Sequence, residues 1–416
     1  MKCDNNKFID VTFRILILIY VLWGSHAWFT WELDSLDKMG QLSVNVLFFI
    51  IAYIYKVKNN IDLLTDTKTI FAVVLFTVPF FLHATLGPLL PINYVCKYFP
   101  IYVLLSDRAR SEYYSNLIIR FLAIVIVPGV IIHTIIEYIN FFPGYPIAYG
   151  NNSAYVFLNY VFSLKSISWY ELDSHRFFSI FAEPGYAGCL FAFVLYASKY
   201  NFSKWETYVL IVGLALTFSL GGYVCAFVGY IFVLMSRGNT IRKMAFFALL
   251  LMPIYYVSID YNHGDNFVNT LIIQRLQPDE EKGFTGNNRV SRVTDEYFDR
   301  LVKDGTIISG IGIDGLDKIN GKGWQNDFEH QYELVRGSGY KMYLITHGVL
   351  FTLLYFLFYY VLACERFPKK NDKYIQGLFV FFVLLFLPTS YPTSLTWLVL
   401  YCLSFNNHIN EVLIYE

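Results

Sequence analysis

Apolar runs of about 18–22 residues recur along the chain and constrain its fold more than any other feature. One such run crosses the roughly 30 Å hydrocarbon core of a bilayer as a single helix. Only 15% of the 416 residues are charged, against roughly 25% in a typical soluble domain. The sequence therefore predicts an all-α polytopic membrane protein, with residues 1–416 forming a single integral membrane domain.

Hydropathy places about twelve transmembrane helices along the chain. Two tight pairs, around Gly87-Pro88 and from Pro388 to Pro392, could each be a re-entrant hairpin or one broken helix. The predicted spans are 8–28, 39–55, 69–86, 88–105, 117–138, 176–198, 205–219, 221–236, 242–259, 339–363, 374–389 and 391–406.

The distribution of basic residues predicts the orientation of these spans. With the N-terminus inside, sixteen Lys and Arg residues fall in cytoplasmic segments, whereas the short external loops hold only Lys38. Both termini are therefore expected in the cytoplasm. The formal net charge is zero, which gives no attraction to nucleic acid. Six scattered cysteines without a CxxC pair indicate neither a disulfide framework nor a zinc site.

Two long loops, about 140–175 and 260–338, fall on the external side, and we expect the second to be partly helical. Residues 289–303 carry an apolar stripe at helical spacing, and Gly305 suits the end of such a helix. Arg289 and Arg292 would lie in its first turn, where two guanidinium groups suit phosphate or pyrophosphate. A solvated charged face with one Glu–Arg pair explains the same pattern. The stripe consists of Val290, Val293, Tyr297 and Leu301.

The stretch "RFFSIFAEPGYAG" (176–188) places charges at the head of a predicted span. On one helix Arg176 and Glu183 would point the same way, about 10 Å apart along the axis. Pro184 could begin a fresh helical segment, and Gly188 would allow close approach of a neighbour. An anion clamp with a buried carboxylate, a candidate general base, is one interpretation. A snorkelling arginine and a structural ion pair is the other.

Histidines and a glycine-rich segment supply weaker signals. Seven of the eight histidines map to the external half, where His330 and His347 are candidates for proton transfer, although interfacial placement explains them equally. We predict no metal, because His330 and Glu333 make only half of a ligand set. The segment "GIGIDG" (310–315) satisfies GxGxxG, but it lies in an external loop. We therefore interpret it as a turn that brings backbone close to another segment, and reject dinucleotide binding.

Three pieces in order resemble the bacterial O-antigen polymerase and ligase superfamily. They are residues 176–188, then "TFSLGGYVCAFVGYIF" (217–232), then "IISGIGIDG" followed by "GSGYKMYLITHGVLF" (337–351). The chain looks more like a Wzy-type polymerase than a ligase, because the ligase commonly has a histidine where this sequence reads "GSGYKMYL". Together these pieces cover roughly residues 170–360.

The resemblance implies a GT-C-like glycosyltransferase in the bacterial cytoplasmic membrane. It would join undecaprenyl-pyrophosphate-linked oligosaccharide repeat units into O-antigen, capsule or exopolysaccharide on the external face, without a cofactor. Arg176, Arg289, Arg292 and Arg336 are the expected pyrophosphate ligands. Glu183 would be the base or would orient an arginine, so the expected catalytic set is Glu183, Arg176 and Arg289.

The expected partners are the lipid-linked donor and acceptor, membrane lipid, and other polysaccharide assembly proteins such as a chain-length regulator. Three alternatives remain: a lipid-linked oligosaccharide flippase, an O-antigen ligase, and a structural scaffold. A flippase would use the same arginines without chemistry, and a ligase would differ in its acceptor.

Overall fold

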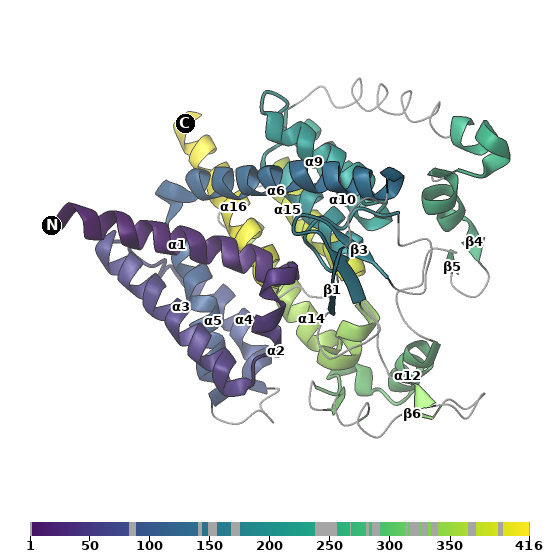
Figure 1. The fold of residues 1–416 in the computed structure, drawn as a ribbon. Coiled ribbons are helices and arrows are strands. Elements are labelled where there is room, and N and C mark those ends of the chain that lie inside the picture. Colours follow the sequence, from purple (N-terminus) through teal and green to yellow (C-terminus); the bar gives the residue numbers. More distant parts are fainter. Residues whose placement is uncertain are drawn as a thin grey trace.

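Helices dominate the computed structural model of the chain (Figure 1). It describes residues 2–82, 89–139, 144–148, 156–167, 175–237, 256–266, 268–279, 283–284, 292–312, 315–316, 319, 324–325, 332–333, 340–364, 372–389 and 394–415.

Most of the described helices form one bundle, and a smaller group lies beside it (Figure 1). The α-helices are α1 (Lys2–Gly24), α2 (Trp31–Ser35), α3 (Lys38–Lys58), α4 (Thr67–Leu82), α5 (Leu89–Ser106), α6 (Ser111–Ile139), α8 (Pro184–Ala197), α9 (Trp205–Leu216), α10 (Leu220–Arg237), α12 (Arg292–Lys303), α14 (Tyr340–Cys364), α15 (Lys373–Thr389) and α16 (Leu395–Tyr415). The short helical turns are η1 (Trp28–Thr30), η2 (Arg108–Arg110), η3 (Tyr261–Gly264), η4 (Asn269–Ile273), η5 (Gln274–Leu276) and η6 (Thr306–Ile308).

Four of the described helical segments are long and apolar enough to cross a membrane, which is the character of a membrane protein. Among the described residues a helix overlaps every predicted span; of the span 242–259 only residues 256–259 are described, and they are helical. Several of these helices are shorter than a full span, so the count of twelve stays a prediction. The four segments are Met39–Lys58, Arg108–Ile136, Leu220–Arg237 and Tyr340–Leu362.

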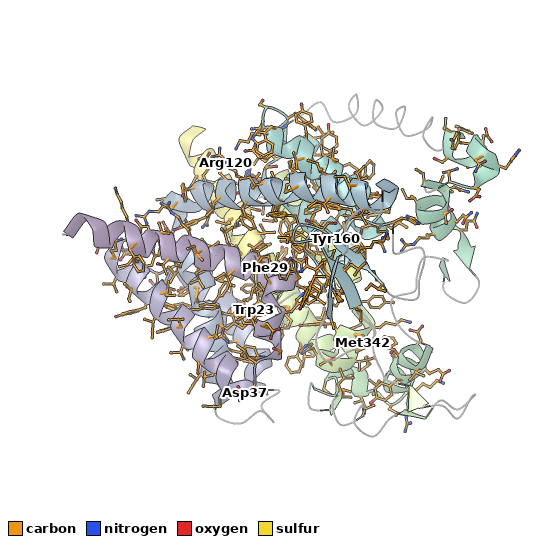
Figure 2. The ribbon with its side chains drawn as sticks, in the orientation of Figure 1. Trp23, Phe29, Asp37, Arg120, Tyr160 and Met342 are labelled. Carbon is orange, nitrogen blue, oxygen red and sulfur yellow. The ribbon has the colours of Figure 1, made fainter. Side chains whose placement is uncertain are left out.

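Helix α8 lies at the centre of the bundle. All 14 of its residues are buried, as expected for a helix that is apolar on every side. It packs against α9, α10, α15 and α16, and side chains fill the space between the helices (Figure 2). The predicted span 176–198 is wrong in its first part, because the helix begins only at Pro184. At 1.5 Å per residue α8 is about 21 Å long, shorter than a full span.

The first long loop contains a small antiparallel sheet that the sequence analysis did not predict. Strands β1 (Tyr145–Ala148), β2 (Val156–Asn159) and β3 (Leu164–Ser166) follow in spatial order, with Tyr145 opposite Asn159 and Asn159 opposite Leu164. Phe157 and Leu164 are buried beside Trp31 and Phe178, so the sheet packs over α2 and the segment that leads into α8. Two shorter pairs also form, β4 (Pro278–Asp279) with β5 (Gly283–Phe284) and β6 (Trp324–Gln325) with β7 (Tyr332–Glu333).

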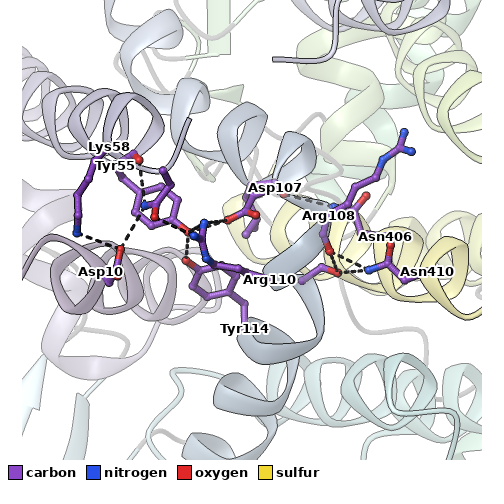
Figure 3. Close-up of polar contacts among 12 residues, drawn as sticks. Asp10, Tyr55, Lys58, Asp107, Arg108, Arg110, Tyr114, Asn406 and Asn410 are labelled. Atoms are coloured by element: carbon purple, nitrogen blue, oxygen red, sulfur yellow. Dashed lines mark hydrogen bonds and ion pairs between the residues drawn. The ribbon is translucent and has the colours of Figure 1, made fainter. Parts of the chain in front are cut away.

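Polar contacts gather where helix ends meet on the side of the bundle that holds both chain termini, which we call the terminal face (Figure 3). The Tyr55 hydroxyl donates to Asp107 Oδ2 at 2.6 Å and accepts from the Tyr114 hydroxyl at 2.6 Å. Arg110 contacts both Tyr55 and Asp107, at 3.1 and 3.3 Å. These bonds hold the end of α3 against the α5–α6 connection. We call the opposite side, with β1–β3 and α12, the loop face.

Candidate functional site

The segment from Arg176 to Glu183 enters the bundle as non-helical chain, so the predicted single helix through both residues is wrong. One backbone bond is internal, from Phe181 N–H to the Phe178 carbonyl at 3.1 Å, and the others go to three distant parts of the chain. Such partners satisfy buried amides and carbonyls that a helix would otherwise pair internally. The bonds are Phe177 N–H to the Leu216 carbonyl (2.9 Å), Leu164 N–H to the Ser179 carbonyl (2.8 Å), Trp28 N–H to the Ile180 carbonyl (2.9 Å) and Ala182 N–H to the His26 carbonyl (3.1 Å).

Ser179 lies in the middle of this segment in an unfavourable conformation. Its φ is +53°, in the left-handed region, and its side chain is fully buried. Among the described residues its hydroxyl has no hydrogen-bond partner. Both features cost free energy and persist only where the surrounding structure holds the residue in place. Backbone strain and buried polar groups without partners are therefore found most often at functional sites.

Arg176 is anchored at the C-terminal end of α9. Its Nε donates to the Thr217 carbonyl at 3.0 Å, and its side chain is partly buried. The C-terminus of a helix carries partial negative charge, so a cation is favoured there. The structure thus holds the predicted anion-binding arginine in a defined place at the α9–α10 turn.

Glu183 occupies the N-cap position of α8, with Pro184 as the first helical residue. This confirms that the proline begins a fresh helical segment, as its missing N–H permits. The Glu183 carboxylate is partly buried, does not cap the helix, and forms no hydrogen bond or ion pair with any described residue. The positive end of the helix dipole favours an anion at this position.

His26 lies close to Glu183, although the sequence analysis did not single it out among the external histidines. Its carbonyl accepts from Ala182 N–H and from Trp31 Nε1, at 3.1 and 3.0 Å. Its imidazole meets the ring of Tyr186, one turn into α8, edge to face at 5.2 Å. The signal in the sequence is its position at the outer end of the first predicted span, 8–28, beside a run of aromatic residues.

Close packing of α8 and α10 fixes the other side of the segment. A Cβ on Gly188 would lie 2.7 Å from Ser219 Cβ and 3.0 Å from Thr217 Oγ1. The prediction that Gly188 permits close approach is confirmed. Since Thr217 also binds Arg176, one turn of chain contacts both the arginine and α8, whose N-cap is Glu183.

On the loop face, α12 confirms the predicted helix and its apolar stripe over Arg292–Lys303, whereas Arg289 and Val290 lie outside the described residues. Val293, Tyr297 and Leu301 are buried together with Ile345 of α14. Lys341 Nζ of α14 contacts Asp295 Oδ1 at 2.7 Å and ties the two helices by charge. The predicted helix end is also confirmed, since Gly305 follows with φ +73°.

The "GIGIDG" segment brings backbone close to another segment, as predicted. Gly310 lies directly against Gly348, and Ile311 N–H donates to the Ile345 carbonyl at 2.9 Å. Gly348 has φ +78° and ψ 169°, which interrupts α14. His347 precedes this interruption, and its ring lies 4.4 Å from that of Tyr343.

The structure therefore places two of the predicted site residues, Arg176 and Glu183, on one buried segment, and a third, His347, at the contact between α14 and the second loop. α12 packs against α14 and η6. Arg289, Arg336 and His330 lie outside the described residues, as does the side chain of Arg292.

Comparison with protein-family models, with curated proteins and with solved structures finds no match to this chain.

Proposed function

We propose that the protein is a glycosyltransferase that joins undecaprenyl-pyrophosphate-linked oligosaccharide repeat units into a surface polysaccharide. In this proposal about twelve spans form a GT-C-like bundle in the bacterial cytoplasmic membrane. The loop face is external, and the terminal face, with both chain ends, is cytoplasmic. The resemblance of residues 170–360 to Wzy-type polymerases supports this choice of reaction.

The observation that carries the proposal is the buried non-helical segment between Arg176 and Glu183. Irregular backbone at membrane depth is tolerated only where it is buried in protein or lines a cavity. This segment carries an arginine held by a helix C-terminus, a strained buried serine, and a carboxylate without a described partner. Charged groups in such a place are costly unless they are used.

The proposed reaction assigns separate roles to the two charged residues. An acceptor sugar hydroxyl attacks the anomeric carbon of the donor, a C–O bond forms, and the bond from that carbon to the pyrophosphate oxygen breaks. Glu183 takes the hydroxyl proton. Negative charge grows on the departing lipid pyrophosphate, and Arg176, already fixed by Thr217, stabilises it without reorganising.

Helix α12 would supply the second part of the pyrophosphate site. Its apolar side is occupied by α14, so its charged side faces away from that contact. Arg300 and Lys303 on it are exposed. In the proposal, Arg292 at its first turn, with Arg289 and Arg336, approaches the second phosphate of the donor or the chain that is being extended.

The test is a reconstituted reaction without nucleotide sugars. Purified full-length protein in nanodiscs is given its lipid-linked repeat unit, and products are separated by gel or mass spectrometry. A ladder of repeat-unit multiples that disappears in Arg176→Ala supports the polymerase. Movement of intact substrate across proteoliposome membranes without a ladder would instead indicate a flippase, and transfer only to an added lipid A–core acceptor a ligase.

A further inference from the structure

A cavity of about 530 Å³ opens on the terminal face, at the end of α8 opposite Glu183. Its walls come from the end of α8, the end of α10, the start of α15 and the late part of α16. Three cationic side chains line it, Lys199, Arg237 and Lys373, together with Asp372 and His408. Nothing in the proposed reaction uses these residues.

Among the described residues Asp372 supplies the one carboxylate that lines the cavity, and both of its oxygens are engaged. Asp372 Oδ1 accepts from the Tyr374 and Ile375 N–H groups, at 2.9 and 3.2 Å, and so caps the first turn of α15. Its Oδ2 lies 2.7 Å from His408 Nε2. Asp372 is therefore not placed to neutralise the other cations of the cavity.

A relay of polar contacts sets the position of Lys199. Its Nζ lies 3.1 Å from His408 Nδ1, and the other ring nitrogen of His408, Nε2, contacts Asp372. Because an ammonium can only donate, His408 Nδ1 accepts the hydrogen bond from Lys199, and His408 Nε2–H donates one to Asp372 Oδ2. The backbone of Lys199 is left-handed, with φ +53°, which turns the chain at the end of α8 toward the cavity.

The other two cations are held by neutral partners. Arg237 Nη2 donates to the Lys199 carbonyl at 2.8 Å, and Lys373 Nζ donates to Gln376 Oε1 at 3.1 Å. Among the described residues neither forms an ion pair with a carboxylate. Three cations therefore converge on a cavity whose one described carboxylate, that of Asp372, bonds to His408 and to the first turn of α15.

We infer that this cavity binds a phosphate ester, and that its source is the headgroup of an anionic phospholipid. Arginine and lysine together suit phosphate, the first as a fork and the second as a point charge. The volume exceeds that of a bare phosphate and leaves room for the glycerol that follows it. Met235, 39% exposed, lines the same cavity on α10, so acyl chains can leave along an apolar surface. Basic pockets between membrane helices are known to take such headgroups.

The inference is independent of the transferase activity and is tested by binding. Full-length protein is placed in phosphatidylcholine nanodiscs with or without phosphatidylglycerol, and the unfolding temperature and the lipid retained on detergent extraction are measured. We expect phosphatidylglycerol to be retained and to raise the unfolding temperature. Arg237→Gln and, separately, Lys373→Gln should each lower its apparent affinity about tenfold.

The matched control is Lys68→Gln, which removes an exposed cation on the same face outside the cavity. A second arm adds inorganic phosphate or glycerol 1-phosphate to protein in neutral detergent. Stabilisation by these soluble anions that equals the lipid effect would keep the phosphate site but assign it to a soluble ligand. Equal retention of phosphatidylglycerol by wild type, both cavity variants and the control would overturn the inference, as would no preference of the wild type for the anionic lipid.

Discussion

Gly188 of α8 and Gly222 of α10 lie in backbone contact, such that a Cβ on Gly222 would meet the carbonyl carbon of Gly188 at 2.8 Å. This contact brings the α9–α10 turn against the start of α8. It thereby sets the distance between the Thr217 carbonyl that holds Arg176 and the helix that begins at Glu183.

Gly222→Val should therefore separate the two helices. Overpacking at a contact between backbones costs about 1–3 kcal/mol, because neither partner can rotate away. We expect a lower unfolding temperature in detergent and loss of any activity that needs Arg176. Val224→Ala, on an exposed part of α10, is the control. A Gly222→Val protein as stable as the control would show that the helices are not in close contact.

Arg176→Lys tests whether geometry or charge matters at the proposed pyrophosphate site. Lysine keeps the positive charge but loses the Nε donor to the Thr217 carbonyl and the forked geometry. We expect the rate of polymer formation to fall about 10- to 100-fold, with less effect on stability. Full activity in Arg176→Lys would remove bidentate phosphate binding from the mechanism.

Glu183→Gln tests the proposed base. The substitution keeps size and hydrogen bonding but cannot accept a proton, and general-base catalysis is worth about 10²–10⁴-fold. We expect the rate of polymer formation to fall by that range, and the acidic limb of the pH–rate profile to disappear. A variant whose profile over pH 4–9 (roughly the range in which carboxyl and imidazole groups titrate) overlays that of the wild type would exclude Glu183 as base.

The docking of α12 on α14 should depend more on its apolar stripe than on its ion pair. Leu301 is 5% exposed, so Leu301→Ala should cost about 2–3 kcal/mol of local stability. Asp295→Asn removes the ion pair with Lys341, in which the two side chains are 24% and 44% exposed, and should cost less than about 1 kcal/mol. Amide hydrogen exchange across 292–303 measures both. Faster exchange in Asp295→Asn than in Leu301→Ala would show that the ion pair, and not the apolar stripe, holds α12 on α14.

The contact between Asp372 and His408 on the terminal face should be sensitive to acid. Burial alone would raise the pKa of Asp372, but the hydrogen bond and charge of His408 and the N–H groups of Ile375 and Tyr374 outweigh it, so the pKa is lowered. A carboxyl with a lowered folded-state pKa stabilises fully above its unfolded value, near about 3.9, and loses this as pH falls through the folded value.

Asp372→Asn should therefore unfold at a lower temperature than wild type at pH 6, and the difference should shrink below about pH 4. Thermal unfolding in detergent over a pH series measures it. Asp304→Asn, at an exposed pair on the loop face, is the control and should show little change at any pH. A difference for Asp372→Asn that grows toward acid pH would contradict the assigned role.

Local pattern was enough wherever a segment's own residues decide its structure. The stripe of Val293, Tyr297 and Leu301 predicted α12 and its buried side, because one helix face must pack against something apolar. Gly305 ended that helix and Pro184 began α8, since each residue type has a backbone preference that few others share. The apolar runs likewise predicted the membrane helices.

The sequence pattern did not predict that Arg176 and Glu183 lie on one non-helical segment. The sequence 176–183 is apolar enough to be helical, yet its amides and carbonyls bond to His26, Trp28, Leu164 and Leu216, which are distant along the chain. The same holds for the packing of the sheet over α2 and for the cations that converge around His408.

The sequence by itself thus determined that the chain is a helical membrane protein, where most of its helices lie, and which residues carry charge into apolar surroundings. Only the tertiary structure decided which of these residues meet. The physical reason is that a buried backbone must satisfy its hydrogen bonds, and the partners for residues 176–182 exist only after distant segments have packed together.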